Sequence, residues 1–320
     1  MSWRLLFDAL APAAGQGRLS VLIFHRVRHQ TDPLFPGELD AERFETQMRR
    51  VSRWFNVLPL PEAVERLRSG TLPARATAIS FDDGYADNCT VALPILRRLG
   101  LSCTFFVATG FLDGGRMWND TVIEAVRGAA ATELDLDFLD LGRHDIGSLL
   151  ARRKTIDTLL GRLKYLDMAE REARAAAIAK LSRTNMPDDL MLSSGQVQTL
   201  CNAGMTIGAH TVSHPILCSI SVEAAREEMR VSKSRLEEIT GKPVRLFAYP
   251  NGKPGKDYSH AHVSIVREVG FAAAFSTSAG VATRHSDLFQ LPRFTPWDRS
   301  AWRYALRMAA NLRLTEPVTA

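Results

Sequence analysis

The chain has 320 residues, of which 46% are hydrophobic and 23% charged. This is enough apolar material for one large α/β domain or two smaller ones. The net charge of +5 favours acidic partners, but we find no nucleic-acid motif and no basic strip interleaved with aromatic residues, so we expect no nucleic-acid partner. The clusters Arg49-Arg50 and Arg152-Arg153-Lys154 lie in helical patterns. We interpret them as solvated helix faces, with an anionic substrate as the alternative.

Residues 1–18 are predicted to be an N-terminal extension. The apolar run Leu5-Leu6-Phe7 is shorter than the about 7 to 15 residues of a secretory h-region. No other segment approaches the roughly 18 uninterrupted apolar residues of a membrane span, so we expect a cytoplasmic protein. Residues 3–14 favour a short amphipathic helix, which either packs on the protein's own body or contacts the inner face of the membrane.

The cysteines are scattered along the chain without a Cys-x-x-Cys pair. This spacing argues against a thiolate zinc site and a disulfide framework. We therefore expect buried free thiols at all four positions: Cys89, Cys103, Cys201 and Cys218.

Short apolar runs alternate with helical patterns along most of the chain. Buried strands are predicted at residues 19–24, 76–81, 102–108, 205–209, 244–249, 271–277 and 288–291, with a short extended piece at 56–60. Helices are predicted at residues 40–54 and 86–99, and another is predicted to begin at residue 61. A capping box at Ser193 and Gln196 begins a helix that should end at Gly204, and an apolar stripe from Val222 to Ile239 predicts one more.

Residues from about 113 to 189 differ from this alternation. They are mostly helical in pattern, with candidate helices near 119–128, 145–165 and 168–184, and we interpret them as an insertion. The remaining seven or eight strands predict an α/β fold whose parallel sheet forms a closed or distorted barrel over residues 19–298, followed by a C-terminal helix and tail at 299–320. Chemistry in such folds collects at the carboxyl ends of the strands.

Two adjacent carboxylates, Asp82 and Asp83, follow one of these strands where Gly84 indicates a turn. Burying an unpaired carboxylate costs several kcal/mol, so the pair needs either a metal ion or basic side chains. His210 and His214 follow another predicted strand, and two histidines four residues apart can converge on one ion. Together these residues favour a site of two histidines and one aspartate with positions open to water.

The ordered motifs resemble those of the polysaccharide deacetylases of carbohydrate esterase family 4, the NodB-homology family. The resemblance rests on Phe81-Asp82-Asp83-Gly84, on His210 to His214 and on Phe247-Ala248-Tyr249-Pro250-Asn251-Gly252, and it covers about residues 19–112 and 190–298. It implies a deformed (β/α)7-type barrel that removes acetyl groups from N-acetylated sugars with a divalent metal, usually zinc, with cobalt or nickel as alternatives.

The resemblance also implies residue roles. Asp83, His210 and His214 would hold the metal, and Asp82 would be the general base that deprotonates a metal-bound water. The segment Tyr249-Pro250-Asn251 would contact the substrate, with the N–H of Asn251 donating to the oxyanion.

The sequence departs from the family pattern in two places. Ala248 occupies the position of an arginine that orients the base, and Arg293 resembles the arginine that some members use instead, with a plain surface arginine as the alternative. No histidine follows His285, so the usual C-terminal general acid is absent. His25 is the predicted replacement because its unperturbed pKa near 6.5 suits protonation of an amine, and a buried structural histidine is the alternative.

Four residues near the expected mouth of the site are candidates for sugar stacking or hydrogen bonding, although core packing or a surface role would also account for them: Trp118, Asn119, Asp120 and Trp297.

These residues support three functional hypotheses. The first is a metal-dependent de-N-acetylase that acts on N-acetylhexosamine residues of an exopolysaccharide or a lipid-linked precursor. The second, motivated by Ala248 and the missing C-terminal histidine, is a non-catalytic glycan-binding or scaffold protein on the same fold. The third, a phosphoacceptor domain using magnesium, is disfavoured by the histidines, because oxygen-only sites prefer magnesium and Asp-His-His sites prefer zinc-like ions.

Overall fold

A seven-stranded sheet forms the centre of the structure. The structure is a computed structural model that describes residues 3–320, so the first two residues of the predicted extension lie outside the described range. The strands run parallel in the order β1-β3-β4-β7-β8-β9, and β2 pairs with the start of β3. Their bounds are β1 Ser20–Phe24, β2 Asn56–Val57, β3 Ala76–Phe81, β4 Thr104–Val107, β7 Thr206–Ala209, β8 Leu246–Ala248 and β9 Ala273–Phe275.

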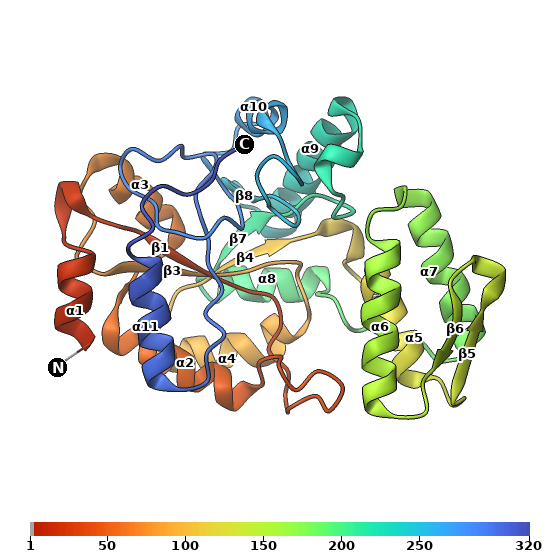
Figure 1. The fold of residues 1–320 in the computed structure, drawn as a ribbon. Helices are drawn as coiled ribbons and strands as arrows, with labels where there is room; N and C mark the ends of the chain where they lie inside the picture. Colours follow the sequence, from red (N-terminus) through yellow and green to blue (C-terminus); the bar gives the residue numbers. More distant parts are fainter. Residues whose placement is uncertain (1–2) are drawn as a thin grey trace.

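The sheet curls so that its first and last strands, β1 and β9, both pair with the segment 291–294. Leu291 forms a bridge with Phe275 in β9, and Phe294 forms a bridge with Leu22 in β1. The predicted α/β fold with parallel strands curled as in a deformed barrel is therefore confirmed (Figure 1). The predicted strand at 288–291 is wrong, because the Asp287 carboxylate accepts a hydrogen bond from the N–H of Phe289 and turns the chain.

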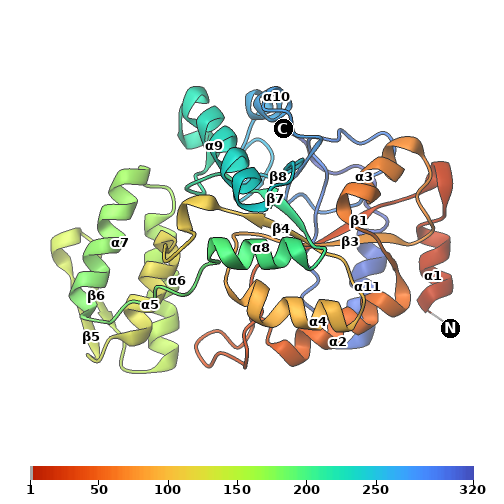
Figure 2. The ribbon, with the colours of Figure 1, turned by 180° about the vertical axis from the view of Figure 1, so that it is seen from behind.

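Helices surround the curled sheet. In Figure 1, α2, α4 and α8 lie below the sheet and α9 and α10 lie above it, and Figure 2 shows the same arrangement from behind. Their bounds are α1 Trp3–Leu10, α2 Ala41–Trp54, α3 Leu60–Ser69, α4 Leu93–Arg98, α8 Ser194–Asn202, α9 Val222–Thr240, α10 His260–Glu268 and α11 Ala301–Asn311. The capping box at Ser193 is present. The helix predicted over 86–99 is instead a five-residue π-helical turn, Asn88–Ala92, that leads into α4.

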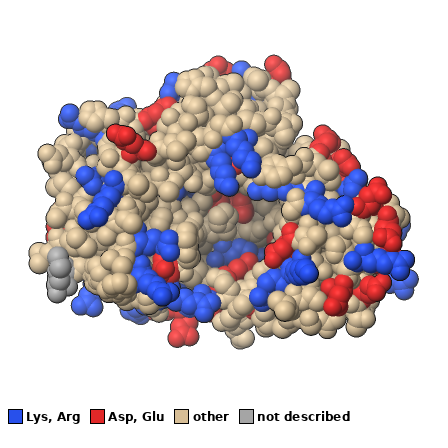
Figure 3. Space-filling model, in the orientation of Figure 1, with Lys and Arg blue, Asp and Glu red and all other residues tan. Residues whose placement is uncertain are grey.

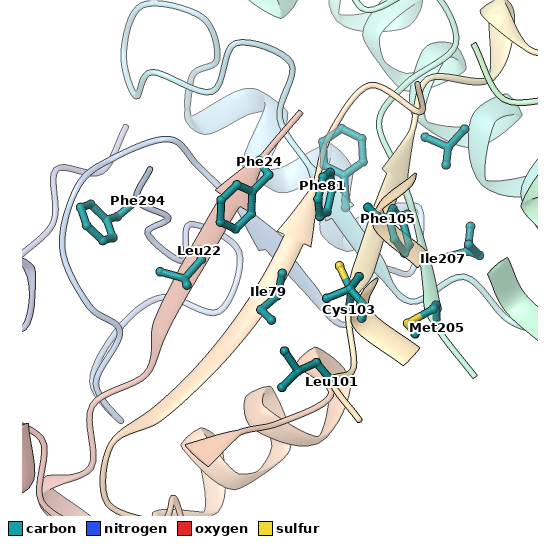
Figure 4. Packing of buried hydrophobic residues seen from close by; sticks show 14 of the residues in the cluster. Leu22, Phe24, Ile79, Phe81, Leu101, Cys103, Phe105, Met205, Ile207 and Phe294 are labelled. Carbon is teal, nitrogen blue, oxygen red and sulfur yellow. The ribbon is translucent and has the colours of Figure 1, made fainter. Parts of the chain in front are cut away.

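Successive residues of each strand enter different apolar clusters. Leu22, Ile79 and Phe105 belong to the large cluster beneath the surrounding helices, and Figure 4 shows these side chains on one face of their strands. Their neighbours Val21 and Phe106 belong to a second cluster on the opposite face. Both faces of the sheet are therefore buried, which explains why the strands read as continuous apolar runs.

The predicted insertion contains three helices and a hairpin: α5 Trp118–Gly128, α6 Leu149–Leu163, α7 Met168–Ser182, β5 Glu133–Leu136 and β6 Gly142–Asp145. The hairpin was not predicted, although Glu133 to Leu136 alternates between exposed and buried side chains. These elements pack around a third apolar cluster, which Leu34 from the barrel side joins. The insertion lies beside the barrel at the right of Figure 1.

The N-terminal helix α1 packs on the protein's own body. Phe7 is fully buried, and its ring centroid lies 6.0 Å from that of Trp54 in α2 and 4.7 Å from that of Phe55. Among residues 3–320, no helix combines the length and the apolar composition that crossing a bilayer requires. The cysteines are all free, but Cys218 is exposed and Cys89 is only partly buried, so the prediction of buried thiols is confirmed for Cys103 and Cys201 alone.

Candidate active site

The two aspartates occupy the end of β3, where the backbone leaves the sheet. The N–H of Asp82 still donates to the Phe24 carbonyl of β1, and the next residue, Asp83, has a φ of 73°. Gly84 follows with a φ of 86°, and a Cβ there would lie 2.9 Å from a methyl carbon of Val107. The turn therefore requires glycine, and it directs the two carboxylates to different partners.

The loop that begins at His210 follows β7 and carries both histidines. Thr211 and His214 have φ values of 68° and 53°. The carboxylate of Glu228, on α9, accepts hydrogen bonds from the N–H groups of Val212 and Ser213, both at 2.8 Å. A glutamate on a neighbouring helix thus stabilises a backbone conformation that L-residues adopt at a cost.

The side chains of Asp83, His210 and His214 converge, with their ligand atoms within 4.8 Å of one another. Asp83 Oδ1 lies 3.5 Å from His210 Nε2 and 3.3 Å from His214 Nε2. The Nδ1–H of His210 donates to the Ala248 carbonyl at 2.7 Å, which leaves Nε2 free as a ligand. One carboxylate and two imidazoles form a donor set that fits a zinc-like divalent ion.

The same groups perturb one another's pKa values. Burial would raise the pKa of the Asp83 carboxyl, but the adjacent His210 and the charges of His25 and His214 hold that pKa well below its usual range. Burial lowers the pKa of His214 to about 4, against the opposing attraction of Asp83. The ionised Asp83 carboxylate and the neutral His214 imidazole are forms that bind a metal ion, whereas the charge of Asp82 raises the pKa of His210 against the effect of its burial.

Asp82 is paired with Arg293, which the sequence places 211 residues away. The guanidinium donates to both carboxylate oxygens, Nη1 to Oδ1 at 2.6 Å and Nη2 to Oδ2 at 2.7 Å. Arg293 is itself 1% exposed, and its Nε donates to the Ser276 carbonyl. Burial opposes ionisation of Asp82, but the Arg293 charge, followed by that of His210, lowers the pKa of its carboxyl. Arg293 thus supplies the charged partner of Asp82 that an alanine at position 248 cannot supply.

His25, Asn251 and Trp297 lie around the opening of the site. His25 follows β1 with an exposed side chain, so it is not a buried structural histidine. It lines a cavity of about 440 Å³ together with Asp83, Asp120 and Trp297. Asn251 has a φ of 58°, and among residues 3–320 we find no acceptor for its N–H.

Of the remaining predicted site residues, some line a cavity and others are buried away from it. Trp118 lines a cavity of about 350 Å³ that also contains Asp83, His214 and Asn251. Tyr249 does not reach either cavity: its ring stacks on that of Tyr258 at 3.8 Å and its hydroxyl donates to the Phe289 carbonyl. Pro250 is likewise buried and lines neither cavity. A direct substrate contact by these two side chains is therefore not supported.

Asp120 was a candidate for hydrogen bonding to a sugar; in the structure it accepts a hydrogen bond from the Tyr85 hydroxyl at 3.1 Å and is 3% exposed. Two other polar groups near the site were not recognised from the sequence. Glu228 and Arg171 lie in charged helical patterns, which show that a helix has a polar face but not what that face contacts.

The chain is similar to known proteins along most of its length. The family model described as polysaccharide deacetylase matches residues 69–133 and 162–274, which is more than half of the chain and omits part of the insertion. The putative polysaccharide deacetylase YxkH of Bacillus subtilis (strain 168) is 18% identical over 278 residues, covering 86% of this chain and 70% of that protein.

Two solved structures are similar in fold. IcaB from Ammonifex degensii has a TM-score of 0.61 at 19% identity, covering 95% of this chain and 98% of that one. The Streptococcus pyogenes deacetylase PplD, solved in complex with acetate, has a TM-score of 0.58 at 19% identity, covering 87% of this chain and 92% of that one.

Proposed function

Because the chain belongs to the polysaccharide deacetylase family, we propose that it is a metal-dependent hydrolase that removes N-acetyl groups from N-acetylhexosamine residues of a glycan. The observation that carries the proposal is the Asp82–Arg293 pair beside the cluster of Asp83, His210 and His214. A carboxylate kept ionised next to a candidate metal-binding set is an arrangement suited to metal-assisted hydrolysis of an amide. The similarity in fold to PplD, whose structure contains acetate, supports the same reaction class.

Asp83, His210 and His214 would hold the ion. When bound, a divalent ion supplies Lewis acidity, which polarises an amide carbonyl and lowers the pKa of water. Asp82 accepts the proton that the attacking water loses. Each carboxylate oxygen has two lone pairs, so the Arg293 bonds leave acceptor positions on Asp82 for that proton.

Two further groups complete the reaction. The Asn251 N–H donates a hydrogen bond to the oxyanion that forms as water adds to the carbonyl carbon. His25 donates a proton to the nitrogen as the carbon–nitrogen bond breaks, so the products are acetate and a free amino sugar. The exposed ring of Trp297 and the half-buried ring of Trp118 provide faces on which sugar rings can stack.

The proposal is tested by assaying acetate release from N-acetylglucosamine oligomers. The purified protein is stripped with a chelator and then reloaded with zinc, cobalt or nickel. We expect acetate only after reloading, and a loss of at least about a hundredfold in rate for His25→Ala, the range for removal of a general acid. Sugar binding without acetate release in any metal would contradict the proposal and support the non-catalytic alternative.

The source of the glycan and the location of the reaction remain predictions. An exopolysaccharide or a lipid-linked precursor at the cytoplasmic face is the proposed substrate, and fractionation of cells that produce the protein checks the location. Metal analysis of the purified protein checks the preference for zinc.

A further inference from the structure

Arg171 is a buried arginine without an acidic partner. It lies in the first turn of α7, in the insertion, and is 4% exposed. Within residues 3–320 its guanidinium makes no hydrogen bond or ion pair, and its Nε is closed off from solvent without an acceptor. Asp167 and Glu172 act on it only through their more distant charges, and burial lowers the pKa of Arg171.

The other two buried arginines of the described chain are neutralised. Arg293 forms its paired bonds to Asp82, and the Nε of Arg75 donates to Asp8 at 2.5 Å. An uncompensated buried charge costs free energy, which an anionic ligand would recover. Arg171 therefore differs from its counterparts in lacking an anion, and none of residues 3–320 supplies one.

The space that Arg171 faces is a cavity that contains two of the three proposed metal ligands. Arg171 lines the cavity of about 350 Å³ together with Asp83 and His214. Its guanidinium carbon lies 5.1 Å from the centre of the Trp118 ring, which lines the same cavity and limits the movement of the arginine. Lys164, at the end of α6, adds a second positive group to the lining. Figure 3 shows both basic and acidic side chains around the hollow between barrel and insertion.

We propose that Arg171, supported by Lys164 and held against Trp118, forms an anion subsite that binds a phosphate or carboxylate group carried by the N-acetylhexosamine substrate. The acetamido group would lie at Asp83 and His214, and the anionic group of the same or the adjoining sugar would lie at the insertion. The insertion is then the part of the chain that selects a charged glycan over a neutral one. This inference rests on the proposed function for the identity of the sugar, but the preference of the subsite for an anionic group follows from Arg171 alone.

Binding titrations test the subsite without turnover. N-acetylglucosamine 1-phosphate, a hyaluronan tetrasaccharide and N,N′-diacetylchitobiose are titrated into the zinc-loaded protein and into the chelated protein. The first ligand carries phosphate, the second carboxylate, and the third no charge. We expect Arg171→Met to weaken binding of an anionic ligand by about tenfold or more, the range for one charge-assisted contact, and to leave diacetylchitobiose within about twofold. Whichever anionic ligand shows the larger loss of affinity in Arg171→Met identifies the group, phosphate or carboxylate, that the subsite binds.

The matched control is Lys180→Met, which removes a positive charge from an exposed position at the other end of α7. Arg171→Lys keeps the charge and should retain part of the preference, which separates charge from the packing of Arg171 on Trp118. Neutral-ligand binding in the same preparation shows that the site is folded. If no metal supports acetate release from any ligand, the proposed function fails while these affinities still decide the subsite. Three results would overturn the inference. Arg171→Met could bind both anionic ligands with unchanged affinity, or it could lose as much affinity for diacetylchitobiose as for the anionic ligands. Alternatively, Lys180→Met could lose as much affinity for the anionic ligands as Arg171→Met does.

Discussion

At the scale of single residues, adjacent carboxylates acquire different chemistry from different partners. Asp82 faces a guanidinium that occupies both of its oxygens, while Asp83 faces two imidazoles. Both carboxylates are held ionised, the first mainly by the fixed positive charge of Arg293 and the second by the neighbouring histidines. Only the second is in a position to share an ion with the histidines. The proposed division into base and metal ligand thus rests on the partners rather than on the carboxylates themselves.

Asp120 gives a prediction on pH and stability. Burial, with the negative charges of Asp83 and Glu124, raises the pKa of its carboxyl to about 7, above the ordinary value of 3.8. Between these values the folded protein holds a proton that the unfolded chain releases, so this carboxyl lowers stability as pH rises from about 4 to 7. We expect Asp120→Asn to remove that loss, which is about 4 kcal/mol in metal-free protein.

The measurement is urea unfolding of metal-free protein at pH 5 and pH 8. The stability of Asp120→Asn relative to the unsubstituted chain should be higher at pH 8 than at pH 5. Asp157→Asn, an exposed position on α6, is the control and should show no such difference. Equal pH dependence of the Asp120 variant and the unsubstituted chain would show that Asp120 is ionised in the folded state throughout this range.

At the scale of elements, the histidine loop depends on a helix that contributes no metal ligand. Glu228 on α9 accepts two backbone hydrogen bonds and one from the Ser213 hydroxyl. We expect Glu228→Ala to weaken zinc binding by about tenfold, because groups that orient ligands typically contribute that much to affinity. Glu227→Ala, which removes only an exposed ion pair with Arg230, should leave zinc affinity unchanged. Competition against a fluorescent chelator measures both, and equal affinities would contradict the role of Glu228.

The sequence predicted elements whose signal is local. The strands at 19–24 and 76–81 and the capping box at Ser193 are present, because apolar runs and capping pairs act over a few residues. The segment 288–291 has the apolar run of a strand, but the Asp287 side chain competes for its backbone. The two bridges of Leu291 and Phe294 depend on how far the sheet curls, which no local pattern contains.

The site was predictable to the extent that its residues follow strands. Asp82, Asp83 and His210 lie at strand ends, and parallel strands bring their carboxyl ends together. Tyr249 was misplaced because a motif position does not show which way a side chain points, and this one enters the core. Arg171 had no signal, since its burial depends on how the insertion packs against the barrel.

At the scale of the whole molecule, the two ends of the chain close the same side of the barrel. Helix α1 packs against α11, and Trp54 of α2 contacts Tyr304 of α11, with ring centroids 6.2 Å apart. This packing links the N-terminal extension, the first layer of helices and the C-terminal helix in one apolar cluster. The extension is therefore expected to contribute to the stability of the barrel.

Phe7→Ala tests this contribution. Phe7 is fully buried among Trp54 and Phe55, so we expect a loss of about 3 to 5 kcal/mol in the free energy of unfolding, the usual range for a buried phenylalanine. Leu5→Ala, on the same helix but 67% exposed, should change it by less than about 0.5 kcal/mol. Urea titration followed by far-ultraviolet circular dichroism measures both. Equal effects of the two substitutions would mean that α1 is not docked as described.

The most direct test of metal-dependent deacetylation by this site is the rate of acetate release per bound metal ion in Asp82→Asn. The substitution leaves Asp83, His210 and His214 intact, so we predict one zinc ion per chain, as in the unsubstituted protein, and a rate lowered by about a hundredfold or more, the range for loss of a general base. An Asp82→Asn protein that holds its zinc and releases acetate at the unsubstituted rate would contradict the account.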